Sequence, residues 1–422
     1  MNSRKKNIWI FHHYATPPTM SGLTRPYDFG VELIEHGYDT TVFSSSYLHF
    51  SDENLINGKD DYIINNDTEI PFVFINTPSY INSGVKRVLN MISFYKKLFK
   101  VSKSYIKDNS KPDIIIASSP HPLTMIAGIK IAKRYKIPCI CEVRDFWPEV
   151  FFTGGVLKED SIIGKILKRG ERWIYEKSNS IIFLKEGDKH YIIDNKWDIK
   201  NGGKIELEKC HYINNGINVE KFNKQIKSNA LNDEDLNSSK FTVVYAGSIR
   251  PVNNVGNIID AAVKLKEYNN IQFLIYGQGN QVEELKKRIR DEGLKNVKMK
   301  GYVSKDYIPY ILSKSSVNIL NYSQEKYNWS RGNSSNKLFE YMASGKPIIS
   351  TVKMGYCPLQ KYSCGLSIDG DSRKELSETI LEIYNMENKE YQCMCKNALK
   401  AANDFDYTEL TNKLILVMER LI

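Results

Sequence analysis

The sequence predicts an α/β protein built from two Rossmann-like domains that face each other across a cleft. Short apolar runs alternate with helical patterns from one end to the other, which is typical of parallel strands joined by crossover helices. A chain of 422 residues, 41% apolar and 26% charged, is long for a single core and suits two domains. Ligands of such sheets bind beyond the carboxyl ends of the strands, so we expect functional residues just after strands.

Apolar runs predict strands in both halves of the chain. They are residues 7–12, 40–44, 72–75, 113–117, 139–143 and 180–184 in the first half, and residues 241–246, 271–276, 296–300, 317–320 and 347–351 in the second. Polar stretches separate the two sets. We therefore expect an N-terminal domain over residues 1–208, a C-terminal domain over 209–403 and a last helix in 404–422. The apolar stripe of that helix, with Leu410 and Leu414, is expected to pack back on the N-terminal domain.

Composition excludes several classes of protein. The formal charge of +10 admits an anionic partner, but the sequence has no zinc finger, RNA-binding signature or helix-turn-helix, so we expect no nucleic-acid partner. No apolar run reaches the roughly 18 residues of a membrane span, and residues 8–11 are too few for a signal peptide, so we expect a cytoplasmic protein. The seven cysteines lack paired zinc-site spacings, which favours reduced thiols and no bound metal.

One segment is strongly basic. Between Lys86 and Lys111 the only acidic residue is Asp108, and the lysines alternate at helix-like spacing with Leu89, Ile92, Tyr95, Phe99 and Tyr105. A basic amphipathic helix of this kind could lie on the anionic inner face of the cell membrane. A solvated lysine-rich face over an ordinary core stripe explains the pattern equally well, so both interpretations stay open.

Two turns after strands of the second half could approach a phosphate. The first is GSIR at 247–250, where small residues admit a diphosphate and Arg250 offers paired donors. The second is YGQG at 276–279. It lacks the third glycine of the dinucleotide fingerprint and does not follow the first strand, which excludes a dehydrogenase.

The most informative segment is SSNKLFEYMASGKPIIS at 334–350. A polar cap opens a short helix, Gly345 ends it, and Pro347 enters a buried strand. Free backbone amides at the start of this helix would face a diphosphate, and Glu340 one turn inward could accept hydrogen bonds from two ribose hydroxyls. In most helices a glutamate at this place is simply solvated.

Several segments resemble the large retaining glycosyltransferase family with the GT-B fold, and they agree with it in order and spacing. KLFEYMASGKPII at 337–349 resembles its nucleotide-binding signature. HHYATPPTMSGLTRPY at 12–27, GYDTTVF at 37–43, EVRDFWPE at 142–149 and YINNGINVEKF at 212–222 resemble further segments of the branch that makes amino-sugar linkages in O-antigens and capsules. Because these motifs are collinear over most of the chain, they are more specific together than any one of them alone.

The resemblance implies a nucleotide-sugar donor, UDP-linked, bound by the C-terminal domain without any other cofactor. Carried over by position, Arg250 and Lys337 would stabilise the diphosphate and His121 would approach the transferring sugar, although an isolated histidine is often structural. The implied donor-binding residues are Gly22, Gly247, Ser248, Gly277, Val303, Asn336, Leu338 and Glu340. Arg25, Arg144 and Asp145 are implied at the acceptor or the cleft, and a pair that merely braces the strand end explains the last two equally well.

Two positions depart from the family pattern. Gly332 stands where the wider family has a glutamate that holds sugar hydroxyls. Residues 251–256 contain no lysine, whereas the family often has one a few residues after the arginine, and Lys337 is a candidate for the missing charge. Recognition of the sugar must therefore differ from the general pattern.

The resemblance implies a retaining, metal-independent transfer of a sugar, such as an N-acetylated amino sugar, to a polyprenyl-diphosphate-linked saccharide in surface-polysaccharide synthesis. Two alternatives stay open: a nucleotide-sugar epimerase of the same two-domain design, and a non-catalytic nucleotide-sugar-binding subunit. Asp233-Glu-Asp235 and Asp369-Gly-Asp371 have the spacing of a metal-binding Asp-x-Asp, but they are more typical of turns and polar linkers.

Overall fold

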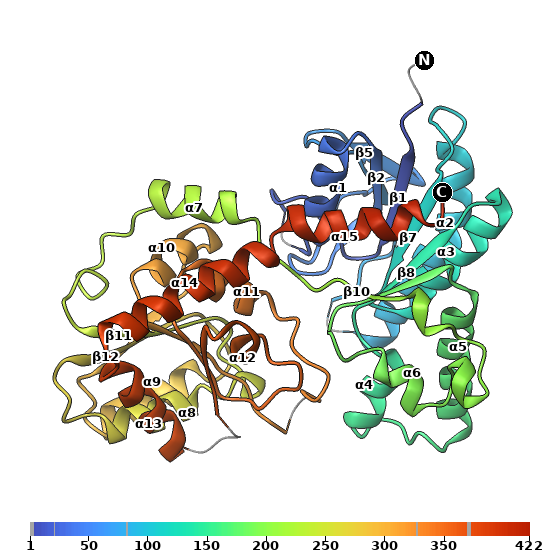
Figure 1. Ribbon diagram of the computed structural model, residues 1–422. Helices are drawn as coiled ribbons and strands as arrows, with labels where there is room; N and C mark the ends of the chain where they lie inside the picture. The colour runs from blue at the N-terminus through green and yellow to red at the C-terminus, as the bar shows by residue number, and fades with distance from the viewer. Residues whose placement is uncertain (1–3, 21, 82, 326–327, 369–372) are drawn as a thin grey trace. The chain divides into compact units, whose positions relative to one another are not determined.

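The computed structural model describes all residues except 1–3, 21, 82, 326–327 and 369–372 (Figure 1). The chain divides into two compact units. Unit 1 comprises Met1–Leu184, Asp188–Ile213 and Leu410–Ile422, and unit 2 comprises Lys185–Gly187 and Asn214–Glu409. Apart from the short segment Lys185–Gly187, the chain therefore passes into unit 2 after Ile213 and returns to unit 1 at Leu410.

Unit 1 is built on an eight-stranded sheet that is parallel except for its edge strand β5. The strands, in sheet order, are β10 (Cys210–Tyr212), β9 (Ser180–Phe183), β8 (Cys139–Val143), β7 (Ile114–Ser118), β1 (Asn7–His12), β2 (Asp39–Ser45), β6 (Phe72–Ile75) and β5 (Tyr62–Asn65). A short hairpin of β3 (Tyr47–Leu48) and β4 (Glu53–Asn54) follows β2. The strand order reverses between β1 and β7, which is the switch point where doubly wound sheets bind ligands.

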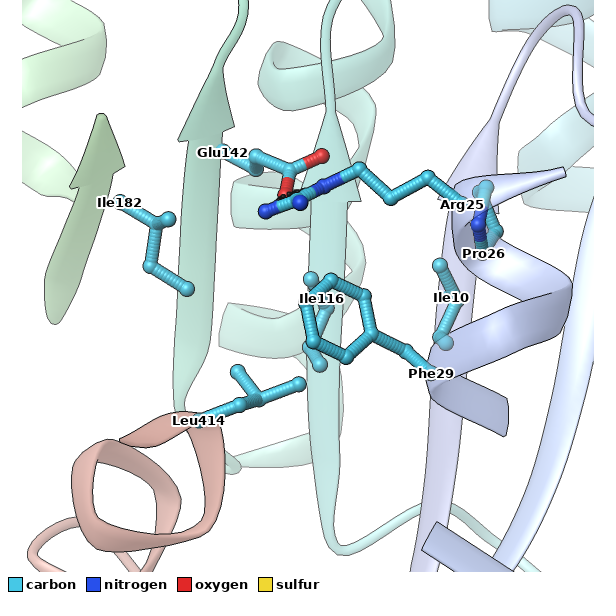
Figure 2. A pocket seen from close by; sticks show the side chains of 8 residues that line it. All are labelled: Ile10, Arg25, Pro26, Phe29, Ile116, Glu142, Ile182 and Leu414. Atoms are coloured by element: carbon cyan, nitrogen blue, oxygen red, sulfur yellow. Dashed lines mark hydrogen bonds and ion pairs between the residues drawn. The ribbon is translucent and has the colours of Figure 1, made fainter. Parts of the chain in front are cut away.

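Helices cover both faces of this sheet, which explains why its strands are apolar on both sides. The helices are α1 (Arg25–Glu35), α2 (Gly84–Tyr105), α3 (Pro122–Tyr135), α4 (Trp147–Thr153), α5 (Ile162–Lys177), α6 (His190–Asp194) and α15 (Tyr407–Glu419). On one face Trp9 and Phe11 pack in a core with Phe94 of α2 and Ile174 of α5. On the other face Ile10, Ile116 and Ile182 line a small cavity with Phe29 of α1 and Leu414 of α15 (Figure 2).

Unit 2 has the Rossmann strand order in a six-stranded, fully parallel sheet. The strands, in sheet order, are β13 (Val297–Gly301), β12 (Ile271–Tyr276), β11 (Phe241–Ala246), β14 (Val317–Leu320), β15 (Ile348–Ser350) and β16 (Gly365–Ser367). The helices are α7 (Val219–Ser228), α8 (Gly256–Lys264), α9 (Val282–Asp291), α10 (Ile308–Ser313), α11 (Asn336–Ala343), α12 (Pro358–Tyr362), α13 (Arg373–Tyr384) and α14 (Asn388–Asp404). Here the switch point lies between β11 and β14.

The predicted fold class is confirmed, and each predicted strand is present within one or two residues of its expected bounds. Two strands of the large sheet were not predicted. β5 is an antiparallel edge strand whose Ile63 and Ile64 are exposed, so it lacks the buried apolar run of a central strand. β10 has only three, half-buried residues.

The basic helix α2 differs in part from the amphipathic pattern predicted for membrane contact. Tyr105 is buried, and Tyr95 and Phe99 pack against the core of unit 1, so this apolar stripe serves the interior. Leu89 is 55% exposed and is the only one of the five interleaved apolar residues that faces outward to that extent. No helix within the described ranges combines the length and the apolar character needed to cross a bilayer.

Candidate functional site

The loops after β11 and β12 interlock in unit 2. The Gly247 amide donates to the Tyr276 carbonyl at 3.0 Å, and the Ile249 amide donates to the Gln278 carbonyl at 2.9 Å. A Cβ atom at Gly277, where φ is +140°, would lie 1.8 Å from the carbonyl oxygen of Gly247. Only glycine fits there, because any side chain would push the two loops apart. The predicted phosphate loop is therefore held in place by its neighbour.

Lys337 reaches this loop from the first turn of α11. A Cβ atom at Gly247 would lie 3.0 Å from the Lys337 Nζ, so the ammonium sits directly beside the glycine. The Nζ donates to the Tyr245 hydroxyl at 3.2 Å and lies 4.8 Å and 4.5 Å from the ring centres of Tyr245 and Tyr322. Two aromatic faces attract a cation at these distances. Lys337, the sequence's candidate for the missing charge, therefore lies beside the predicted phosphate loop.

The same setting withdraws Lys337 from water. Burial lowers the pKa of its ammonium from the usual 10.5 to about 7, and the carboxylate of Glu340 opposes this shift only in part. The side chain is therefore partly neutral at physiological pH. A diphosphate beside it would favour the charged form, because an opposite charge within a few ångström raises the pKa of a lysine.

The start of α11 offers further donors next to Lys337. The first amides of a helix have no partner within the helix, and those of Asn336 and Lys337 donate to no residue in the described part of the chain, so they are available to a ligand. Leu338 differs from the expectation, because its amide already donates to the Ser335 carbonyl at 3.1 Å and its side chain is buried. Glu340 is half-buried, and its carboxylate has no hydrogen-bond or ion-pair partner among the residues that the structure describes.

The remaining donor-site residues of unit 2 lie at the same edge of the sheet. Ser248 and Arg250 are exposed on the loop after β11, and Val303 is half-buried two residues beyond the end of β13. Gly332, which replaces the expected glutamate, has φ of +111°, a backbone conformation that strains any residue with a side chain. The local backbone conformation therefore explains why a glycine, and not the family's glutamate, stands at position 332.

Three tyrosines of this site were not predicted. Tyr245 is 1% exposed and donates to the Ser248 carbonyl at 2.7 Å, so it ties Lys337 to the phosphate loop. Tyr341 donates to the Ala246 carbonyl and accepts from the Ala246 amide, which joins α11 to β11. Tyr245 lies near the end of β11, Tyr322 follows β14 and Tyr341 is on the signature helix, and these positions were the signal. Sequence spacing does not show which ring meets Lys337.

In unit 1 a buried carboxylate organises the end of β8. Glu142 accepts from Arg25 Nε at 2.8 Å and from the Ser118 hydroxyl at 2.5 Å, and a nitrogen of Arg144 lies 3.9 Å away. Burial alone would raise the pKa of Glu142, but the charge of Arg25, with smaller effects of Arg144 and Ser118, lowers it to about 2. Figure 2 shows Arg25 and Glu142 meeting above the apolar wall of the small cavity.

The three residues expected at the acceptor or cleft differ in their exposure. Arg25 is 4% exposed and also donates to the Ile213 carbonyl at 2.9 Å, so it braces the interior of unit 1. Arg144 is partly buried beside Glu142, and its amide donates to the Ser119 hydroxyl. Asp145 is exposed. In the glycine loop after β1, a Cβ atom at Gly22 would lie 2.2 Å from the Thr16 hydroxyl, which explains the small residue there.

His121 lies in a cluster of buried histidines at the switch point of unit 1. It precedes α3, and its Nε2 is 2.7 Å from the Nδ1 of His13, which follows β1. His12, the last residue of β1, belongs to the same cluster. All three are fully buried, and burial lowers the pKa of His12 and of His121 to about 3.

Of the two Asp-x-Asp candidates, the one that the structure describes, Asp233 and Asp235, has a structural role. Lys300 pairs with Asp233 at 2.7 Å and with Asp235 at 2.6 Å, and Lys298 also contacts Asp235, so both carboxylates hold the linker to β13. The segment from Asp369 to Asp371 lies outside the described residues. All seven cysteines are free thiols, five of them buried.

Comparison with known proteins identifies both halves of the chain. Residues 24–221 match Glycosyltransferase Family 4, and residues 227–401 match Glycosyl transferases group 1. No curated protein sequence matches the chain.

Solved structures share the fold over nearly their whole length. The sucrose-phosphate synthase of Thermosynechococcus elongatus superposes with a TM-score of 0.68 at 14% identity, over 99% of both chains. HepE of Anabaena, solved with UDP-glucose, gives 0.64 at 15% identity over 98% of this chain and 100% of its own. WaaG, a glycosyltransferase involved in lipopolysaccharide biosynthesis, gives 0.61 at 14% identity over 96% and 98%. With a family 4 domain followed by a group 1 domain on a GT-B fold, the chain is a glycosyltransferase.

Proposed function

We propose that the chain is a retaining glycosyltransferase that transfers a sugar from a UDP-linked donor to a lipid-linked saccharide in the synthesis of a surface polysaccharide, such as a capsule or O-antigen. The observation that carries the proposal is the position of Lys337 beside Gly247 at the start of α11. A cation, free helix amides and a glycine that admits close approach are what a diphosphate requires.

The chemistry follows from where negative charge develops. As the glycosidic bond breaks, charge accumulates on the departing diphosphate, and preorganised donors can stabilise that charge without a metal ion. Lys337, Arg250 and the α11 amides are suited to this task. The hydroxyl of the sugar acceptor then attacks on the same face, a diphosphate oxygen takes its proton, and the configuration is retained. HepE has been solved with UDP-glucose, which supports uridine as the base.

Substitutions at Glu340 and Arg250 test the donor site. We expect Glu340→Ala and Arg250→Ala each to weaken UDP binding about 10- to 100-fold by calorimetry, since charge-assisted hydrogen bonds contribute roughly 1.5–3 kcal/mol. The matched controls are Glu267→Ala and Arg290→Ala, because both residues are exposed in unit 2 away from the carboxyl ends of the strands. Unchanged affinity in both test variants would remove the proposed donor site.

Release of UDP that depends on a lipid-linked saccharide would separate a transferase from an epimerase or a binding subunit.

A lipid-linked acceptor calls for a surface that meets a membrane, and unit 1 carries exposed apolar side chains at one edge. The helices α2, α4 and α5 all begin at the carboxyl edge of the sheet, after β6 and β8. Apolar residues at least half exposed here are Ile81, Val85, Val88, Leu89, Val150, Val156, Ile162, Ile163 and Ile166. Lys86 lies within this apolar group, and the other lysines of α2 lie farther along the helix, with Lys96 and Lys100 exposed. We infer that this edge, more than the lysine face alone, contacts anionic lipid.

Vesicle flotation tests the membrane contact. We expect Ile162→Ser/Ile163→Ser/Ile166→Ser to reduce binding to anionic vesicles at least tenfold, because a fully buried isoleucine contributes about 1.5–3 kcal/mol. Lys96→Gln/Lys97→Gln/Lys100→Gln should lower binding at low salt only, since surface charges are screened. The control Lys264→Gln/Lys266→Gln/Lys295→Gln changes exposed lysines of unit 2. Wild-type flotation of both test variants would contradict the membrane contact.

A further inference from the structure

A chain of hydrogen bonds runs from α2 to His121 inside unit 1. The Asn90 Oδ1 is 2.6 Å from the Nε2 of His13, and the Nδ1 of His13 is 2.7 Å from the Nε2 of His121. Asn90, His13 and His121 are each 0% exposed. The Nδ1 of His121 is buried and has no hydrogen-bond partner among the described residues. A buried polar atom without a partner lowers the stability of the fold. The unpaired Nδ1 at the end of this hydrogen-bond chain therefore indicates a further partner.

The orientation of Asn90 sets the direction of the first bond. Its amide nitrogen donates to the Pro78 carbonyl at 2.7 Å and to the Thr77 hydroxyl at 3.0 Å. A carbonyl oxygen can only accept, so the nitrogen of the Asn90 amide must face Pro78 and its oxygen must face His13. The proton between Asn90 and His13 therefore belongs to the Nε2 of His13.

The direction of this bond determines the direction of the next one, between His13 and His121. Burial lowers the pKa of both His13 and His121, and the positive charge of Arg87 acts in the same direction, so both rings are neutral. A neutral imidazole carries one proton, so the Nδ1 of His13 has a lone pair and accepts from the Nε2–H of His121. The lone pair of His121 is left on its Nδ1.

We infer that Asn90 and His13 are positioning residues that hold His121 in one tautomer, so that its Nδ1 accepts a hydrogen bond from a hydroxyl group of the transferred sugar. This inference rests on the proposed function for the identity of the ligand, but the tautomer itself does not. A ring held in this way is neither a cation nor a proton donor towards the ligand. It selects a hydroxyl because a ligand oxygen without hydrogen would leave the lone pair unpaired.

His12 supports a hydroxyl as the partner. The Tyr14 amide donates to the Nδ1 of His12 at 3.2 Å, so its proton lies on Nε2, and that atom is also buried without a hydrogen-bond partner in the described part of the chain. His12 and His121 are close enough to affect each other electrostatically. One unpaired donor and one unpaired hydrogen-bond acceptor match a hydroxyl group, which both donates and accepts.

Nitrogen NMR of the full-length protein tests the tautomer without any ligand. In protein labelled with ¹⁵N-histidine, with the His121 signals assigned from a His121→Gln variant, we expect a protonated Nε2 and an unprotonated Nδ1 from about pH 6 to 8. The Asn90→Leu variant removes the oxygen that orders the chain, so both tautomers of His121 should be populated. The Asn90→Asp variant keeps an oxygen facing His13, with its other oxygen protonated so that it donates to the Pro78 carbonyl, and should keep the single tautomer.

Binding of UDP-glucose tests the role of that tautomer. On saturation with UDP-glucose we expect the Nδ1 signal of His121 to move towards that of a hydrogen-bonded nitrogen, while UDP alone leaves it unchanged. A proton on Nδ1 in the resting wild-type protein would overturn the inference. So would a single, unchanged tautomer in a folded Asn90→Leu variant. UDP-glucose that binds but leaves the His121 signals unmoved would overturn the hydroxyl contact, whereas failure of UDP itself to bind would count against the proposed function alone.

Discussion

Replacing Lys337 with methionine should lower kcat about 100- to 1,000-fold, because removing one preorganised donor from a developing anion has effects of that size in other enzymes. Methionine keeps the length and apolar stem of the side chain, so packing between Tyr245 and Tyr322 is largely preserved. The measurement is steady-state release of UDP from a UDP-sugar in the presence of a lipid-linked saccharide. Lys346→Met, in the turn after α11, is the control.

The lowered pKa of Lys337 makes donor binding depend on pH. The diphosphate binds the charged lysine better, and the pKa of this group is about 7 in the free protein, so it rises in the complex. Affinity for UDP-glucose should be highest below pH 7 and fall as the pH rises above 7, by up to about tenfold per unit. UDP-glucose is the better probe because its phosphates lack the terminal ionisation of UDP, which falls near pH 6.

A Lys337→Arg variant separates the charge from its titration. Arginine stays protonated at these pH values, so the variant should bind UDP-glucose with little change between pH 6.5 and 8.5. If wild-type affinity were equally flat over this range, Lys337 would not be the group that meets the diphosphate. If Lys337→Met retained wild-type turnover, the proposed stabilisation of the leaving group would have to be assigned elsewhere.

The sequence predicted the sheets well because their strands are buried on both faces and form nearly continuous apolar runs. β1 and β11 are examples, with every residue of β1 buried and all but the first of β11. β5 escaped prediction because its stability comes from pairing with β6 at an edge, and Ile63 and Ile64 stay exposed. The local pattern of apolar residues predicts a strand that is buried. It does not predict a strand, such as β5, that is held only by pairing with its neighbour.

The donor-site motifs were also local: two are turns at the ends of β11 and β12, and the third begins helix α11. What surrounds them is not local. The rings of Tyr245 and Tyr322, which flank the ammonium of Lys337, come from two different strands and their ends, and Arg25 meets Glu142 across 117 positions of sequence. The histidine chain likewise joins Asn90, His13 and His121 from three separate segments. Spacing along the chain carries no information about such contacts. The sequence therefore identified His121 and Lys337 as candidates without the residues that contact them.

Removing the charge of Arg25 is expected to destabilise unit 1 more than any single change on its surface. Arg25→Met leaves Glu142 ionised in a site that is 5% exposed, and losing one partner of a buried ion pair costs about 3–5 kcal/mol. The measurement is urea unfolding at pH 7 followed by tryptophan fluorescence, since Trp9, Trp147, Trp173 and Trp197 lie in unit 1. The control Arg4→Met breaks an exposed pair with Asp113, which should cost no more than about 1 kcal/mol.

Acid should reduce the difference between Arg25→Met and wild type. In the wild type the pKa of Glu142 is about 2, below its ordinary 4.5, so the pair stabilises the fold above pH 4.5 and this stabilisation is lost as the pH falls towards 2. Without Arg25, burial raises the pKa of Glu142, and protonation at mildly acidic pH then removes the buried charge. Adding Glu142→Gln to Arg25→Met should recover part of the lost stability at pH 7 for the same reason. If Arg25→Met were as stable as Arg4→Met, or if the double variant were weaker than the single one at pH 7, the carboxylate of Glu142 would not depend on Arg25 for its charge.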